Sequence, residues 1–230
     1  MKRDHQVHHV GLPFYKLRAM VIVILLTSCS FAATTQPKST IILPTQDPKS
    51  PDAILSNSRQ ALLSVKSYRM TSVWTRSVGS PTEEHIVFVA PDRYQSKMPG
   101  ICPNGVEWES LQIGKTSYSR CPPNAWRSAQ MGLDPPHIRL VNTYWDHAKS
   151  IGSVRREAIG ANTFLRIDAE YSRPYNGKME TGKLSFLIDE RTLLPYKLDI
   201  DMVYQDLRSI GNIEFSEFNL PMTIPDPVLE

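Results

Sequence analysis

Apolar and polar residues alternate through much of the second half of the chain, and this period of two constrains the fold more than any other feature. The alternation is clearest in the segments 184–188, 197–204 and 212–216. Side chains point alternately to the two faces of a β-strand, so each segment has one apolar and one polar face. Successive strands of this kind, joined by short turns, predict a meandering antiparallel sheet that buries one face.

The first half of the chain carries shorter strand patterns. These patterns occupy residues 68–74, 86–90, 93–98, 106–111 and 116–120, and a further one follows at 165–168. The pairs Asn104-Gly105 and Gly114-Lys115 are turn signals beside them. We therefore expect the sheet to begin early in the chain and to continue to its end.

Two segments have helical spacing instead. Apolar residues recur three and four positions apart in 52–65, where Asp52 is the expected N-cap, and again in 136–149. Two helices are too few to cover a broad sheet lying flat. The sheet is therefore expected to curl around them and to leave an apolar hollow. The predicted fold class is α+β, with a curved antiparallel half-barrel wrapped over a few helices.

The N-terminal segment has the features of a secretory signal. Four basic residues precede or enter a short apolar run at 19–27, which is too short to cross about 30 Å of hydrocarbon. Leu26-Thr27-Ser28-Cys29 follows and resembles the bacterial lipobox, in which the cysteine is acylated and becomes the first mature residue. An ordinary signal peptide with an incidental cysteine is the alternative.

This boundary divides the chain into three parts. Residues 1–28 are expected to be a lipoprotein signal peptide, 29–51 a proline-rich tether, and 52–230 one domain. The predicted location is the outer, extracytoplasmic face of a bacterial cell membrane, held by a lipid on Cys29.

The expected cleavage before Cys29 argues against two classes of function, nucleic-acid binding and metal binding. The whole chain has 26 Lys and Arg against 23 Asp and Glu, but the part from Cys29 onward has 22 of each sign, which argues against nucleic-acid binding. His5, His8 and His9 lie in the expected leader. The remaining histidines are scattered, so no metal site and no cofactor is predicted.

Cys102 and Cys121 are an even pair in a chain expected to be exported. Such a pair predicts a disulfide, with two free thiols as the alternative.

Several local motifs occur in the same order as in a known family. They are Ser67-Tyr-Arg-Met-Thr71, Phe88-Val-Ala-Pro-Asp-Arg-Tyr94, Ile113–Arg120 before Trp126, Leu187–Lys197 and Phe215–Ile224. With the lipobox and tether before them, they resemble the lipoprotein carriers of the LolA/LolB type and the related mycobacterial LppX/LprG lipoproteins. The resemblance runs from about Asp52 to Ile224.

The resemblance implies a half-barrel with an apolar cavity that holds acyl chains, and lipid or lipoprotein binding without catalysis. The family supplies no catalytic residues to carry over. Strand residues on the inner face are therefore the candidates for the cavity lining, with ordinary core packing as the alternative for each. They are Met70, Trp74, Phe88, Leu165, Phe186, Ile188, Leu198, Ile200 and Met202.

Catalytic alternatives are weaker. Gly114-Lys115-Thr116 ends like a phosphate-binding loop, but the glycine required five positions earlier is Glu109. The acid pairs Glu107/Glu109 and Asp199/Asp201 alternate with apolar residues, which places them on the solvated face rather than in a site for acid–base chemistry.

A second class of binding protein stays open. Curved sheets of this kind also resemble the sensor domain of periplasmic regulators of the RseB type, which bind a membrane-protein partner.

The lipobox interpretation is tested by metabolic labelling with a fatty acid. Wild-type protein should incorporate the label and Cys29→Ala should not, because the acylated thiol is removed. Equal labelling of the two proteins would contradict the interpretation.

Overall fold

The computed structural model describes residues 50–130 and 134–229 of the 230. The predictions for Cys29, for the signal peptide 1–28 and for the tether through residue 49 lie outside the described residues. In the part that is described, no helix is long and apolar enough to cross a membrane.

The core of the structure is one antiparallel sheet of eleven strands. Its order is β6-β5-β4-β3-β2-β1-β11-β10-β9-β8-β7. The strands are β1 (Ser67–Arg76), β2 (Thr82–Val89), β3 (Arg93–Met98), β4 (Trp108–Ile113), β5 (Thr116–Arg120), β6 (Arg127–Gln130), β7 (Ala148–Ile159), β8 (Asn162–Tyr175), β9 (Lys178–Asp189), β10 (Pro195–Tyr204) and β11 (Leu207–Ser216).

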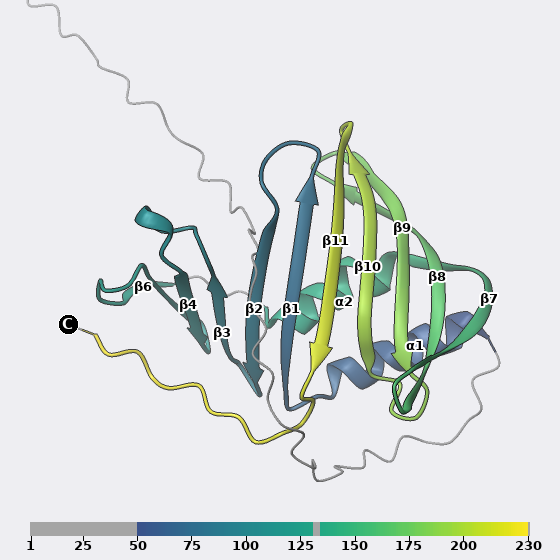
Figure 1. Cartoon of the computed structure of the whole chain (residues 1–230), viewed down its shortest axis with the longest axis horizontal. Coiled ribbons are helices and arrows are strands. Elements are labelled where there is room, and N and C mark those ends of the chain that lie inside the picture. Colours follow the sequence, from purple (N-terminus) through teal and green to yellow (C-terminus); the bar gives the residue numbers. More distant parts are fainter. Residues whose placement is uncertain (1–49, 131–133, 230) are drawn as a thin grey trace, which may run out of the picture.

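The sheet consists of two meanders joined at one seam. Strands β1 to β6 follow one another across one half of the sheet, and β7 to β11 across the other. The seam is the antiparallel pairing of β1 with β11, which extends from Arg69 opposite Ser216 to Arg76 opposite Ser209. Strands from opposite ends of the domain therefore lie side by side at the centre of the sheet (Figure 1).

The sheet curves around two short helices, α1 (Pro51–Leu63) and α2 (Pro136–Thr143). Both helices lie on the concave side of the sheet (Figure 1). The predicted α+β half-barrel is confirmed. Its inner face is apolar because the alternating residues of β8 to β11 point toward the helices, where Ile167, Phe186 and Leu198 are almost completely buried.

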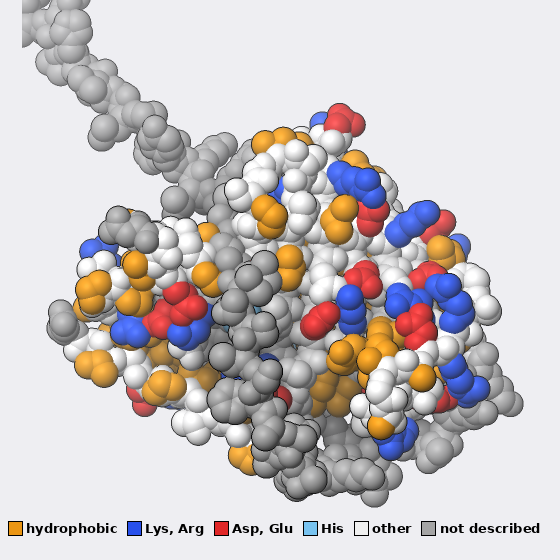
Figure 2. Space-filling view, viewed as in Figure 1, with side chains coloured by type: hydrophobic (Ala, Val, Ile, Leu, Met, Phe, Trp, Pro, Cys, Tyr) orange, Lys and Arg blue, Asp and Glu red, His pale blue; other side chains and the backbone are white. Residues whose placement is uncertain are grey.

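The outer face carries the polar half of the alternation. Lys and Arg side chains lie beside Asp and Glu over the half of the sheet formed by β7 to β11 (Figure 2). Arg208 pairs with Asp201 at 2.6 Å, and Arg166 binds Glu157 and also donates to Ser185 Oγ at 2.8 Å. These polar pairs between neighbouring strands stabilise an outer face that is exposed to water.

Helix α1 begins one residue earlier than expected, and its cap is a different residue. Ser50 is the N-cap, since its hydroxyl accepts a hydrogen bond from the Ala53 amide at 3.2 Å, and Pro51 occupies the first helical position. The expected N-cap, Asp52, instead bonds the Ser150 hydroxyl at 2.6 Å and ties the helix to β7.

The second predicted helix is too long. Helix α2 ends at Thr143, a 3-10 turn (η2) covers Trp145–His147, and β7 begins at Ala148. Residues after the turn pair with β8, for example Ala148 with Tyr171 and Ser150 with Ala169. This long-range pairing overrides the helical spacing of the segment. Arg59 of α1 holds the turn through two hydrogen bonds to Asp146, at 2.6 and 3.2 Å.

Strands β6 and β7 are absent from the sequence predictions because both are edge strands. In β7 the charged residues Lys149, Arg155, Arg156 and Glu157 interrupt the apolar alternation on which those predictions depend. Charges on an edge strand discourage pairing with another chain, so this composition suits its position.

The predicted disulfide is confirmed. Cys102 and Cys121 are bonded, with their Cα atoms 5.6 Å apart, and the bond joins the segments on either side of β4 and β5.

An aromatic cluster attaches α2 to the inner face of the sheet. The His137 ring lies 4.5 Å from the Phe88 ring and 5.8 Å from the Tyr68 ring, measured between centroids. All three side chains are buried. Burial lowers the pKa of His137 to about 4, so the ring is neutral at pH 7.

This histidine should make stability depend on pH. An unfolded histidine titrates near 6.5, so between pH 6.5 and 4 the unfolded chain binds a proton that folded His137 does not. The free energy of unfolding should therefore fall as the pH is lowered through this window, by up to about 3 kcal/mol. His137→Phe keeps the ring packing and should flatten this part of the profile in urea unfolding.

Ile138→Phe on the same helix is the matched control, because it adds a ring but retains His137 and should retain the wild-type slope. Identical pH profiles for wild type and His137→Phe would refute this role of the histidine.

Candidate functional site

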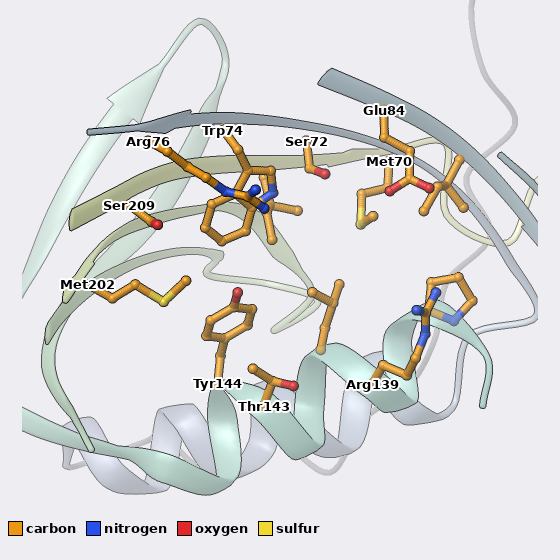
Figure 3. Close-up of a pocket in the computed structure, with 14 residues that line it drawn as sticks. Met70, Ser72, Trp74, Arg76, Glu84, Arg139, Thr143, Tyr144, Met202 and Ser209 are labelled. Carbon is orange, nitrogen blue, oxygen red and sulfur yellow. The ribbon is translucent and has the colours of Figure 1, made fainter. Parts of the chain in front are cut away.

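A pocket of about 250 Å³ lies between α2 and the inner face of the sheet. Side chains from β1 and β2 form one wall, β10 and β11 contribute at one end, and α2 closes the opposite side (Figure 3). The lining residues are Met70, Ser72, Trp74, Arg76, Glu84, Ile86, Pro136, Arg139, Leu140, Thr143, Tyr144, Met202, Ser209 and Ile213.

Most of the lining is apolar. Met70, Ile86 and Ile213 are buried at the base of the pocket. Trp74, Leu140 and Met202 are only partly buried, although each packs against the hydrophobic core. The pocket therefore presents large apolar side chains that an apolar ligand would remove from water.

A glycine on β11 sets the position of Trp74. Gly211 lies directly opposite Trp74 in the register of β1 and β11. A Cβ at Gly211 would lie 2.6 Å from Trp74 Cζ3, so the indole ring covers the glycine and occupies the space of its missing side chain. Glycine inside a strand commonly marks such a close approach.

A polar cluster on β8 and β9 holds the C-terminal end of α2. Arg173 donates to Thr143 Oγ1 at 3.3 Å and to Glu180 at 2.9 Å, and the Tyr171 hydroxyl donates to Glu180 at 2.7 Å. Burial raises the pKa of Tyr144, which packs beside Tyr171, and both tyrosines stay neutral at ordinary pH. The cluster thus fixes the helical wall without charging the pocket.

The other end of the pocket holds two charged side chains. Glu84, on β2, is 8% exposed and accepts a hydrogen bond from Ser96 Oγ. Arg139 approaches from α2, with its guanidinium 5.8 Å from the centroid of the Tyr94 ring. Burial raises the pKa of Glu84, while the Ser96 bond and the charge of Arg139 lower it, and the net shift is upward.

The structure divides the nine candidate cavity residues into two groups. Met70, Trp74 and Met202 line the pocket. The other six belong to the packed core, namely Phe88, Leu165, Phe186, Ile188, Leu198 and Ile200. The helices and the η2 turn cover this second group, as in the contact of Trp145 with Phe186 at 4.9 Å between ring centroids.

Sequence reasoning missed the residues that α2 contributes and the polar residues of the strands. Glu84 carried a usable signal, because it is in phase with Ile86 and Phe88 and therefore faces inward. The sequence carried no such signal for Leu140 and Arg139, because it does not show by itself which side of α2 faces the sheet.

The acid pairs are structural, and one prediction about them is wrong. Asp199 and Asp201 are on the outer face and partly exposed, as expected. Glu109 was expected to be solvated, but its side chain is 8% exposed and lies between Lys97 at 2.9 Å and Arg120 at 2.5 Å. Burial alone would raise the pKa of Glu109, but its bonds to these two cations bring the net shift downward. A carboxylate held in this way is ill suited to proton transfer.

The close fit of Trp74 over Gly211 can be tested by a double-mutant cycle. Gly211→Ala should lower the free energy of unfolding by about 1–3 kcal/mol, because the added methyl group collides with the indole ring. In a Trp74→Ala background the same substitution should cost much less, since the colliding ring is gone. An equal cost in both backgrounds, measured by urea unfolding, would show that the ring does not occupy this position.

No protein-family model matches the sequence, and no curated protein matches it. Solved structures do match the fold. LprF from Mycobacterium bovis aligns at a TM-score of 0.56 with 18% identity, over 77% of this chain and 96% of that one. Lipoprotein LppX from Mycobacterium tuberculosis aligns at a TM-score of 0.52 with 14% identity, over 78% of this chain and 100% of that one.

A LolA-superfamily protein from Nitrosomonas europaea aligns over 76% of this chain and 95% of that one, at 8% identity and a TM-score of 0.33, too low to carry an argument. The two mycobacterial alignments cover about three quarters of this chain and nearly all of each mycobacterial chain. The chain therefore has the fold of LprF and LppX.

Proposed function

We propose that the protein is a membrane-anchored, extracytoplasmic lipoprotein that binds a lipid or acyl chain in the pocket beneath α2. Binding of this kind would serve lipid or lipoprotein transport across the envelope. The observation that carries the proposal is the pocket itself, an apolar hollow on the concave face of a fold shared with the lipoprotein LppX.

The chemistry of the walls supports an aliphatic ligand. Trp74, Leu140 and Met202 leave apolar surface uncovered inside the pocket. Covering such surface contributes about 25 cal/mol for each Å² removed from water. The flexible thioethers of Met70 and Met202 adapt to a chain without one fixed shape.

The volume supports a slender ligand. About 250 Å³ lies slightly below the range of roughly 300–1,000 Å³ that is usual for small-molecule pockets. A single chain fits this space better than a lipid with several bulky acyl groups.

The chemistry of the described residues supports binding rather than catalysis. The four carboxylates considered for acid–base work lie on the outer face, away from the pocket, and all four make ion pairs with Lys or Arg side chains. Within residues 50–130 and 134–229, no cluster of three or more His, Cys, Asp or Glu is placed to hold a metal ion.

Anchoring through Cys29 is the second half of the proposal. It rests on the lipobox and on the proline-rich residues that precede Ser50, where the described domain begins. A lipid anchor and a tether of this length would keep the pocket close to the membrane that holds its ligand.

The proposal predicts that the purified protein carries lipid and that filling the pocket removes it. Organic extraction followed by mass spectrometry should recover an acyl-chain compound from wild-type protein. Leu140→Trp should reduce the amount at least tenfold, because the larger ring occupies the pocket from α2. The displacement of a neutral apolar dye, N-phenyl-1-naphthylamine, by decanol measures the same loss in solution.

Asn142→Trp is the matched control, since it places the same ring on the exposed side of α2. Wild-type protein that yields no lipid and takes up no dye would overturn lipid binding. Recovery of one stoichiometric membrane protein with no bound lipid would favour the sensor alternative instead.

A further inference from the structure

Two opposite charges face each other across one end of the pocket without meeting. Glu84 projects from β2 and Arg139 from α2, on opposite sides of the space (Figure 3). Among the described residues, the ion pairs with N–O distances within 4.0 Å do not include these two. Glu84 instead accepts a hydrogen bond from the Ser96 hydroxyl, and the guanidinium of Arg139 lies over the Tyr94 ring.

Hydrogen-bonding capacity is left over on both sides. Arg139 Nε is buried and has no hydrogen-bond partner within the described part of the chain. A carboxylate has about four acceptor positions, and the hydroxyl of Ser96 takes one on Glu84. A buried polar group without partners destabilises the folded protein, so this end of the pocket favours a ligand that supplies those partners.

A third polar group lies beside them. Ser72 is the cross-strand partner of Glu84, is buried, and lines the same pocket. The end of the pocket therefore offers an acceptor, a donor and a hydroxyl, while Trp74, Arg76 and Met202 line the opposite end (Figure 3).

The chemistry of this set distinguishes classes of ligand. A hydroxyl group donates to Glu84 and accepts from Arg139 at the same time, so it satisfies both charges. A carboxylate or phosphate would bond Arg139, but in ionised form it has no hydrogen to donate to Glu84 and is repelled by the ionised form of that residue. An alkyl or ether group has no hydrogen to donate, so it would leave the carboxylate of Glu84 without a further hydrogen-bond donor.

We propose that Glu84 and Arg139 together bind the hydroxyl group of an uncharged, hydroxylated lipid whose chain extends toward Trp74 and Met202. This inference rests on the proposed function, because it assigns the polar group of the ligand held in the same pocket. It selects neutral lipids that carry a free hydroxyl over fatty acids and other anionic lipids.

The test compares three probes at pH 7.5 that share an unbranched chain of ten carbons: 1-decanol, decanoate and decyl methyl ether. Each competes with N-phenyl-1-naphthylamine for the wild-type protein, so no variant has to fold for the main result. Decanol should bind about tenfold or more tightly than either other probe, since a hydrogen bond to a charged group contributes about 1.5–3 kcal/mol.

The variant Glu84→Gln reverses one part of this ranking. It removes the negative charge that repels an anion and leaves Arg139 in place, so the affinity for decanoate should rise about tenfold or more. Glu170→Gln, which neutralises an exposed carboxylate on β8, is the matched control and should keep the wild-type ranking. Thermal unfolding confirms that both variants are folded.

The outcomes separate the two proposals. Equal affinities of wild-type protein for all three probes would refute the hydroxyl site but leave chain binding intact, as would occur if water bridges the two charges. Decanoate binding most tightly would show that Arg139 recognises an anion, which also refutes the hydroxyl site. Displacement by none of the probes would refute chain binding itself.

Discussion

The pairing of β1 with β11 is the interaction on which the rest of the structure depends. It joins residues more than 130 positions apart and turns two separate meanders into one sheet. The long sheet has a single apolar face, and its twist allows that face to close around the helices. The same seam places Ser72 and Arg76 of β1 opposite Ile213 and Ser209 of β11, so it also builds the strand wall of the pocket.

The pocket exists because the helical layer is shorter than the sheet that it covers. Helix α1 and the η2 turn fill the concave face over β8 to β10, and there the inward side chains pack as an ordinary core. Helix α2 has only eight residues, and it stands over β1 and β2 with its far end held by Arg173. The space left between this helix and the strands is largely apolar, with Glu84 and Arg139 at one end and Arg76 beside Trp74 at the other (Figure 3).

Sequence patterns predict the sheet well and the site only in part. Strict alternation identifies β8 to β11, because their outward positions meet water and their inward positions meet the core. The same rule fails for β7, whose edge position calls for charges. Helical spacing misleads after Thr143, where the η2 turn and then the pairing of β7 with β8 from Ala148 replace a helical continuation. Glu109 shows a related limit, since burial of an outward carboxylate depends on Lys97 and Arg120, which lie on neighbouring strands.

The sequence by itself determined the fold class, the disulfide pair and the inward set of strand residues, because each follows from local periodicity or from residue type. Only the tertiary structure decided which inward residues line a cavity. Phe88 and Trp74 have the same pattern in sequence, yet His137 of α2 packs on Phe88, while Trp74 covers Gly211 and is only partly buried in the pocket wall. The difference lies in where a short helix ends over a curved sheet, and that position depends on long-range packing rather than on local pattern.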